Sequence, residues 1–306
     1  MKICDLAGAD IRSALKSTGL QIQIGPFWFS IRSKLPDVHE HLTNLYRYAN
    51  TDSQPRFIDF SIEVDRKKSS IRGWLKPVAE FTFNGNVPFT PLPLDQSPAL
   101  LEWGINWCVS AHAHQFLILH AAVVEKDGKA LVMPALSGSG KSTLTAALVS
   151  KGWRLLSDEL ALLCVDSGQV FPFTKPISLK NASIDVIKDY WLDARFGKSC
   201  TDTVKGTVSH LCPPDASVVR TNDSATVAAF IFPKFRSGAA PSLSSRAKSS
   251  AYMTIVENAF NYYLLGERGF ECASYVLNHS EAFDLSFGDL DDAIALVSQI
   301  WGGESL

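Results

Sequence analysis

The chain has 306 residues, of which 46% are hydrophobic and 20% are charged, and its net charge is -2 with a pI near 6.4. This composition is typical of a globular protein that buries a core, so it excludes a disordered chain, and the length predicts about two domains of ordinary size. The charge gives no reason to expect a nucleic acid or an anionic membrane as a partner.

The cysteines and the N-terminus carry compartment signals. Six cysteines are scattered without a Cys-x-x-Cys pair, which favours reduced thiols over a zinc site or a disulfide framework. The N-terminus has Lys2, Asp5 and Asp10 in place of an apolar run, and no stretch approaches ~18 uncharged apolar residues. We therefore expect a cytoplasmic protein without membrane insertion.

Residues 1–95 predict a small α+β module. Gly25-Pro26 separates two β-prone runs, which indicates a hairpin. The pattern predicts strands at 21–24, 27–31, 57–64, 71–75 and 78–83, and a helix at 38–48. Four prolines crowd residues 88–98, and because proline disfavours both helix interiors and strand ladders, we expect a linker there. The predicted domains are therefore 1–95 and 96–306.

The second domain predicts an α/β fold with a mixed sheet. A helix at 99–114 and a hairpin of strands 116–124 and 129–134 lead to a loop and a further helix that ends at Gly152. Beyond it, the pattern predicts strands at 153–156, 160–165, 171–179, 227–232 and 275–278, helices at 184–194, 252–265 and 290–300, a polar loop at 198–208 and a mobile loop at 237–250. The strand at 227–232 is expected to end at Pro233.

The segment 131–149 predicts a nucleotide phosphate site, because an apolar strand leads into a loop of small residues ending Gly-Lys-Ser and then into a helix. In this Walker A pattern the loop amides and the helix N-terminus bind phosphate, the lysine reaches the β- and γ-phosphates, and the serine hydroxyl binds Mg²⁺. The pattern departs from the full motif at Ala135, where glycine is expected. The residues predicted to bind ATP or GTP are Leu136, Ser137, Gly138, Ser139, Gly140, Lys141, Ser142 and Thr143.

Two acids, Asp158 and Glu159, follow the strand predicted at 153–156. A P-loop kinase needs one carboxylate at the magnesium ion and another that accepts the proton of the attacking hydroxyl, and this pair offers both. A solvated turn between strands is the alternative. His120 ends a β-prone run and is a candidate neighbour of the loop, although a single histidine is more often a packed core residue.

These segments occur in an order and spacing that resemble the HPr kinase/phosphorylase family. The family loop, Gly-x-Ser-Gly-x-Gly-Lys-Ser, is matched at Ser137, Gly138, Gly140, Lys141 and Ser142, and the family's Asp-Asp pair is Asp158-Glu159 here. The chain looks closest to the HPr-kinase-related kinases (type A) outside the sugar-transport system, which are associated with ribosomally made peptides and with cell-envelope assembly. The resemblance covers residues 116–165 well and 165–265 faintly, and it does not include 1–95.

The resemblance implies a role for each of these residues. Asp158 takes the place of the base at the acceptor hydroxyl, Glu159 and Ser142 lie on the magnesium side, and His120 positions Asp158; which acid has which role stays open. The family's Arg-Gly-x-Gly signature is not present as such. Its nearest counterpart is Lys205-Gly206-Thr207, and residues 233–236 are the nearest counterpart of a later basic segment of the family. The candidate contacts to phosphate or substrate are Lys205 and Arg236, and Lys234 or Arg246 could also supply the cation.

The sequence therefore predicts an ATP-dependent, magnesium-requiring P-loop kinase of the HPr kinase type. By analogy with the family, its preferred acceptor is a serine of a protein or peptide. The alternatives are a kinase of small-molecule hydroxyls and a non-catalytic module that senses ATP. The oligomeric state and the presence of a phosphorylase activity stay open.

Overall fold

The computed structural model describes residues 1–52, 57–67, 77–136 and 138–301. Contacts divide these residues into two compact units, which we treat separately. The first comprises Met1–Val109, Lys175–Asp185 and Asp193–Thr221, and the second comprises Ser110–Thr174, Val186–Leu192 and Asn222–Leu306. The division into domains 1–95 and 96–306 stays a prediction, but the contacts group the residues differently, because two later segments return to the first unit.

The first unit contains two sheets. The larger has the order β1-β2-β3-β4-β5, in which only β2 and β3 pair in parallel. The strands are β1 (Leu20–Ile24), β2 (Phe27–Arg32), β3 (Phe60–Arg66), β4 (Val78–Phe83) and β5 (Leu92–Pro93). The smaller sheet has the antiparallel order β11-β13-β12, with β11 (Ile177–Lys180), β12 (Cys200–Thr203) and β13 (Gly206–Leu211). The helices are η1 (Ile3–Asp5), α1 (Gly8–Lys16), α2 (Pro36–Leu45), η2 (Leu94–Gln96), α4 (Ser97–His112) and α7 (Asp215–Val219).

Several expectations for this unit are confirmed, and two are wrong. The β1–β2 hairpin turns at Gly25-Pro26, and α2 and α4 lie where helices were predicted. The predicted strand at 71–75 lies outside the described residues. The linker at 88–98 instead contains β5 and η2, since Leu92 and Pro93 pair with the edge of β4. The polar loop at 198–208 is a hairpin, in which Cys200 and Val208 are buried partners while Thr201, Asp202 and Lys205 are exposed.

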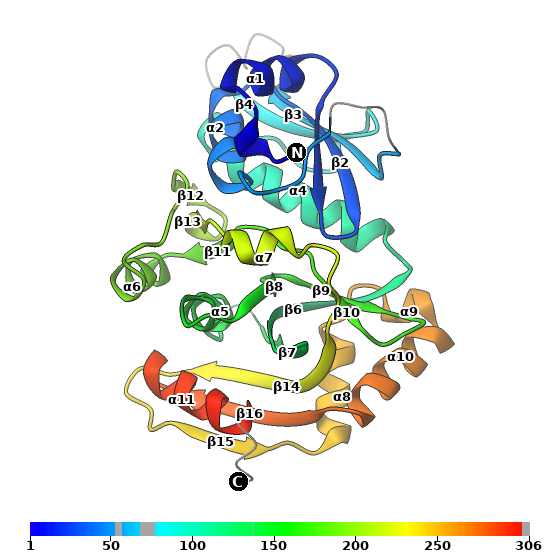
Figure 1. Cartoon of the computed structure of the whole chain (residues 1–306), viewed down its shortest axis with the longest axis vertical. Coiled ribbons are helices and arrows are strands. Elements are labelled where there is room, and N and C mark those ends of the chain that lie inside the picture. The colour runs from blue at the N-terminus through cyan, green and yellow to red at the C-terminus, as the bar shows by residue number, and fades with distance from the viewer. Residues whose placement is uncertain (53–56, 68–76, 137, 302–306) are drawn as a thin grey trace. The chain divides into compact units, whose positions relative to one another are not determined.

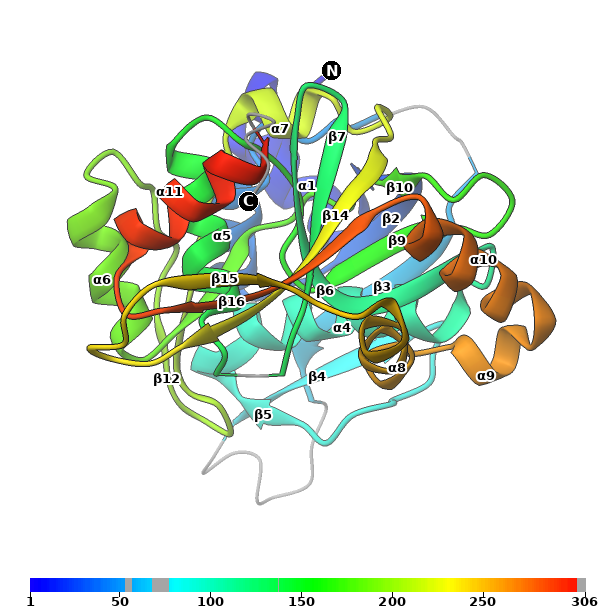
Figure 2. The same cartoon turned by 90° about the horizontal axis from the view of Figure 1, so that it is seen from below.

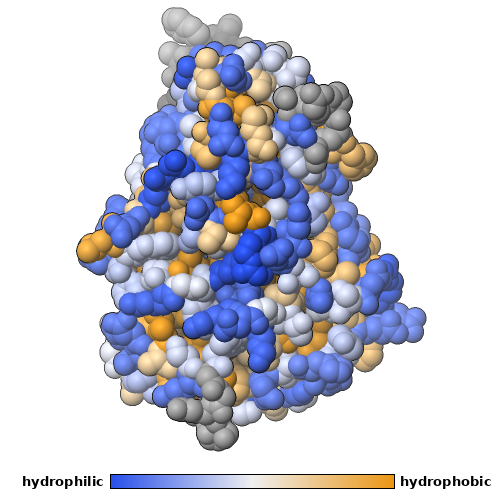
Figure 3. Space-filling model, viewed as in Figure 1, coloured by the Kyte–Doolittle hydropathy of each residue, from blue (hydrophilic) through white to orange (hydrophobic). Residues whose placement is uncertain are grey.

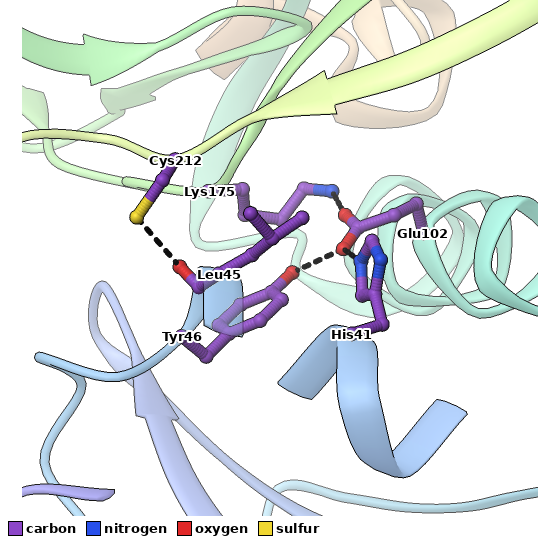
Figure 4. A network of polar contacts seen from close by, with 6 residues as sticks. All are labelled: His41, Leu45, Tyr46, Glu102, Lys175 and Cys212. Carbon is purple, nitrogen blue, oxygen red and sulfur yellow. Dashed lines mark hydrogen bonds and ion pairs between the residues drawn. The ribbon is translucent and has the colours of Figure 1, made fainter. Parts of the chain in front are cut away.

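A buried polar network joins α2, α4 and the start of β11 in the first unit (Figure 4). The carboxylate of Glu102 accepts hydrogen bonds from His41 Nε2 and the Tyr46 hydroxyl, both at 2.8 Å, and pairs with the ammonium of Lys175 at 2.5 Å. Burial alone raises the pKa of Glu102, but the charge of Lys175 and the hydrogen bond from His41 bring this pKa well below its ordinary value. Glu102 is therefore ionised in the folded state.

The second unit is built on one mixed sheet with the order β10-β9-β6-β7-β14-β16-β15, and β8 also pairs with β6 (Figure 1). Its strands are β6 (Phe116–Lys126), β7 (Lys129–Pro134), β8 (Arg154–Ser157), β9 (Leu160–Cys164), β10 (Val170–Phe171), β14 (Thr226–Phe235), β15 (Ser242–Ser245) and β16 (Glu281–Phe287). The mixed α/β class predicted from the sequence is confirmed: β7, β14 and β16 are mutually parallel, whereas β6 runs antiparallel to β7, β8 and β9.

Helices cover both faces of this sheet. They are α5 (Lys141–Ser150), α8 (Lys248–Glu257), α9 (Tyr262–Leu265), α10 (Glu267–Asn278) and α11 (Leu290–Trp301), while α6 (Ala182–Tyr190) is shared between the units. Figure 2 shows α5 and α11 on one side of β14 and β16, with α8 and α10 on the other side. The core on the α8 and α10 side contains Leu119 and Val123 of β6, Phe230 of β14, Ile255 of α8 and Val276 of α10.

Three expectations for the second unit are wrong. The loop expected at 237–250 contains β15 and the start of α8, and the strand expected at 275–278 is the end of α10, whose buried side is spaced helically at Cys272, Ala273 and Val276. The strand β14 also continues beyond Pro233 to Phe235. The backbone nitrogens of Pro233 and Phe235 face the same side of β14, because they are two residues apart, and the N–H of Phe235 points away from β16. On that side the pairing with β7 has already ended before Pro233. The N–H that proline lacks is therefore not needed for a ladder hydrogen bond.

The exposed surface agrees with the composition. On the face shown in Figure 3, separate hydrophobic groups are scattered among hydrophilic residues. Within the described ranges, no helix is both long and apolar enough to cross a bilayer.

Candidate functional site

The loop after β7 has the strand–loop–helix context that the motif requires. The chain leaves the sheet after Pro134, and α5 begins at Lys141, with Gly140 as the residue before its first turn. Gly138 and Gly140 both have φ of 89°, a left-handed conformation that residues with a side chain rarely adopt. Ala135, the departure from the motif, is absent from the described residues with positive φ, so its backbone does not require glycine.

The end of β14 fixes this loop from the neighbouring strand. The N–H of Phe235 donates to the carbonyl of Ser139 at 2.9 Å, and a Cβ placed on Gly140 would lie 2.8 Å from Cβ of Phe235. The ring of Phe235 packs edge-on against Phe287 of β16, with centroids 5.7 Å apart. The backbone of the loop therefore approaches β14 more closely than a side chain at position 140 would allow.

The loop residues differ in their exposure. Lys141, in the first turn of α5, is buried with 7% of its surface exposed, whereas Ser142 and Thr143 are half-buried. Leu136 is 78% exposed, and Gly138 is also exposed. Ser137 lies outside the described residues.

The acid pair lies at the same edge of the sheet as the loop. Because β7 and β8 are both antiparallel to β6 and lie on either side of it, their carboxyl ends point the same way. On β6, Ala121 pairs with Pro134 of β7, and its N–H donates to the carbonyl of Glu159 at 3.2 Å. Two strand spacings, roughly 10 Å, thus separate the end of β7 from the acidic turn.

A side chain within the acidic turn holds its backbone. The hydroxyl of Ser157 accepts a hydrogen bond from the N–H of Leu160 at 3.1 Å. Asp158 is buried, with 4% of its surface exposed, and Glu159 is half-buried. A buried carboxylate beside a half-exposed one suits a proton acceptor that is shielded from bulk water next to a more accessible metal ligand.

His120 lies one residue before Ala121 on β6 and therefore at this same edge. Its neighbours Leu119 and Ala121 point into the core, so the half-buried ring of His120 points to the opposite face of the strand. Its N–H donates to the carbonyl of Asn258 at 2.7 Å, and its ring centroid lies 6.2 Å from that of Phe260.

The two predicted cations belong to different units. Arg236 is exposed and follows β14 directly, one residue beyond the Phe235 contact with the loop, so it lies at the site edge of the second unit. Lys205 lies between β12 and β13 of the first unit, where its ammonium is 5.1 Å from the ring centroid of Trp103. The structure thus brings together the loop, His120, the acid pair and Arg236, while the role of Lys205 stays a prediction.

Two contributors were missed at the sequence level, Phe235 and the segment 258–261 beside His120. Both act through main-chain hydrogen bonds between segments far apart in the chain. Backbone pairing of this kind leaves no periodic or compositional signal.

The comparisons with known proteins bear on this region. The family described as "SynChlorMet cassette protein ScmC" matches residues 103–182, a segment that contains β6, β7, the loop and the acid pair. No curated protein matches the chain in sequence. Among solved structures, the chain is similar to the Hpr(Ser) kinase/phosphatase from Coxiella burnetii, with 11% identity over 61% of this chain and 95% of that chain, at a TM-score of 0.29. A TM-score this low carries no residue or role from that protein to this chain.

Proposed function

We propose that this chain binds ATP with Mg²⁺ and transfers the γ-phosphoryl group to a hydroxyl acceptor. The observation that supports this most is that the Gly-Lys-Ser loop after β7 and the acid pair after β8 lie at one edge of one sheet. Phosphoryl transfer needs little covalent chemistry from the protein, so a phosphate cradle and a carboxylate held within reach of it are its main requirements.

The loop residues fit a nucleotide–magnesium complex. The left-handed glycines bring the backbone close to any bound phosphate, and the N-terminus of α5 adds partial positive charge. In this proposal Lys141 binds the β- and γ-phosphates, and Ser142 with Glu159 holds the ion. Mg²⁺ usually keeps several waters and takes only one or two carboxylates beside the phosphates, so this small donor set is sufficient. When bound, the ion neutralises charge on the phosphates.

Asp158 is the proposed base. Its burial protects it from bulk water, and its place after β8 keeps it at the sheet edge that carries the Gly-Lys-Ser loop. In this proposal it accepts the proton of the acceptor hydroxyl as the oxygen attacks the γ-phosphorus, while His120 orients it and Arg236 stabilises charge on the transferred group. The preferred acceptor is a serine of a protein or peptide.

The test uses the purified chain, a fluorescent ATP analogue and γ-labelled ATP with Mg²⁺. Lys141→Ala should lose both nucleotide binding and phosphoryl transfer, whereas Asp158→Asn should keep binding and lose transfer to any serine-containing acceptor or to water. The matched controls are Lys151→Ala, at the other end of α5, and Asp127→Asn, in the β6–β7 turn at the opposite edge.

The alternatives give different results. Transfer only to small-molecule hydroxyls would move the assignment to a small-molecule kinase. A wild-type chain that binds ATP but never transfers label would instead be a nucleotide-sensing module, and a chain that binds no nucleotide would overturn the proposal altogether.

A further inference from the structure

Large apolar side chains are concentrated on the surface of the helical segment that follows β15. Among the described residues, six of the fifteen exposed large hydrophobic side chains lie between positions 253 and 275. Four of them form what we call the α9 patch: Phe260 (55% exposed), Tyr263 (86%), Leu264 (68%) and Phe270 (56%). Single exposed apolar residues are ordinary, but clusters of this kind mark interaction sites.

The patch has rigid support. Beneath it, the hydroxyls of Tyr252 and Tyr262 are hydrogen-bonded at 2.8 Å, and the Tyr252 ring packs edge-on against Phe270 at 6.0 Å. The side chain of Asn261 donates to the carbonyl of Phe116 at 2.8 Å and accepts from the N–H of Ile118 at 3.0 Å, which fixes the start of α9 to β6. A partner that binds here meets a surface that needs little ordering, which favours affinity.

The patch is continuous with the candidate site. The N–H of Phe260 donates to the carbonyl of Ile118 at 2.9 Å, and the Phe260 ring is the one that packs beside His120. Figure 2 shows α8, α9 and α10 gathered on one side of the second unit. A chain lying across the patch at Phe260 would therefore extend directly to the edge that carries His120.

The border of the patch is acidic. Glu267 and Glu271 are exposed and lie one turn apart on α10, and Glu267, three residues before Phe270, borders that ring on the same face of the helix. Exposed Glu257 precedes Phe260 at the end of α8. The one basic residue of α10, Arg268, is ion-paired with Asp166 at 3.0 Å. This charge favours a partner with lysine or arginine and disfavours an anionic lipid surface.

We propose that the α9 patch docks a peptide segment of the phosphate acceptor in which apolar residues alternate with basic ones near the reacting hydroxyl. The apolar residues pack on Tyr263, Leu264 and Phe270, and the basic ones face Glu267 and Glu271. The proposal rests on the proposed kinase function for what the peptide delivers, but the docking itself needs no nucleotide.

The test measures fluorescence anisotropy of a labelled peptide that carries one serine among alternating lysines and leucines, against a twin with glutamate in place of lysine. The full chain should bind the lysine peptide at least ~10-fold more tightly than its twin. Tyr263→Ser with Leu264→Ser should weaken this binding ~10-fold or more, as expected for residues that dominate an interface. Glu267→Lys with Glu271→Lys should reverse the preference between the two peptides. The matched control is Leu192→Ser, which removes a side chain 88% exposed elsewhere on the second unit.

A parallel assay of nucleotide binding separates this proposal from the kinase proposal. If the lysine peptide docks but is never phosphorylated, the kinase proposal fails while the docking surface stands. If the patch variants bind and phosphorylate the peptide like wild type, the docking proposal fails while the kinase stands. A further outcome is that the wild-type chain self-associates while the variant with Tyr263→Ser and Leu264→Ser is monomeric. This result would show that a second copy of the chain covers the patch, and it would also overturn the docking proposal.

Discussion

The main chains of Phe235 and Ser139 are hydrogen-bonded: the N–H of Phe235, the last residue of β14, donates to the carbonyl of Ser139 at 2.9 Å. The parallel sheet thus extends by one hydrogen bond into the loop that precedes α5. The conformation of the loop consequently depends on a strand almost one hundred residues further along the chain, as well as on its own glycines.

Gly140→Ala tests this dependence. The added methyl would need a φ of 89° and would lie 2.8 Å from Cβ of Phe235, so the loop must move away from β14. We expect ATP affinity to fall at least ~10-fold, an effect of ~1.4 kcal/mol, measured with a fluorescent nucleotide. The matched control is Gly152→Ala, which has a φ of 92° but open space around its Cβ. Gly152→Ala should strain the backbone about as much as Gly140→Ala does, but it should leave nucleotide affinity unchanged. If both variants lost the same nucleotide affinity, the close contact with Phe235 would not be the cause.

Glu102→Gln tests the buried network of the first unit. At neutral pH, removal of the carboxylate leaves Lys175 buried opposite a neutral group, so unfolding free energy should fall by roughly 3 to 5 kcal/mol. The folded-state pKa of Glu102 lies below its ordinary value of 4.5. The ionised carboxylate therefore contributes fully to the unfolding free energy above pH 4.5, and this contribution is lost as the pH falls below 4.5. Denaturant titrations at several pH values should therefore show wild type and variant converging below pH 4.5. The control is Glu63, which is half-buried at the surface and pairs with Arg32 at 3.3 Å, and Glu63→Gln should cost less than ~1 kcal/mol. If the unfolding free energies of wild type and Glu102→Gln differed by the same amount at every pH, Glu102 would not be the ionised, stabilising group that we infer.

The six thiols should react with iodoacetamide in a defined order. All are free; Cys4 is exposed and Cys164 is half-buried. Burial raises the pKa of Cys108 and Cys272 to about 12 and that of Cys212 to about 11. At Cys164 burial also acts to raise the pKa, but hydrogen bonds from Ser167 and the backbone outweigh it and lower the pKa. Mass spectrometry of the native chain at neutral pH should find Cys4 and Cys164 modified first and Cys108 and Cys272 only after denaturation. Early labelling of Cys108 would show that α4 opens readily.

The sequence predicted those parts of the fold whose causes are local. The β6–β7 hairpin follows from Asp127-Gly128, which take φ of 57° and 78° as a tight hairpin turn requires, and α5 follows from the loop motif. The acids Asp158 and Glu159 were located because they directly follow a strand. In each case a few adjacent residues determine the backbone.

The errors fall where tertiary contacts decide. The strand β12 carries polar residues and becomes a strand because β13 offers it an open edge, and β14 passes through Pro233 because β7 has already ended. The positions of Phe235 and Asn258 beside the site depend on pairings between distant segments. Single-sequence periodicity contains none of this information.

Variants of a buried ion pair test whether the edge of the second unit opposite the loop affects nucleotide binding. The carboxylate of Glu125 pairs with the guanidinium of Arg154 and also accepts the N–H of Gly128 at 2.6 Å, while Arg154 donates to the carbonyl of Asp223 at 2.9 Å. This network joins the β6–β7 turn to β8 and to the approach to β14. Arg154→Met should leave the Glu125 carboxylate in the core without its counter-ion and lower the unfolding free energy by roughly 3 to 5 kcal/mol, measured by denaturant titration.

The double variant, Arg154→Met with Glu125→Gln, removes the buried charge along with its partner and should recover more than half of that loss. Because the pair lies at the edge away from the loop, variants that remain folded should bind ATP as tightly as wild type. If the double variant is no more stable than Arg154→Met alone, removing the Glu125 charge has recovered no unfolding free energy. Arg154 would then stabilise the fold through its hydrogen bond to Asp223 and its packing.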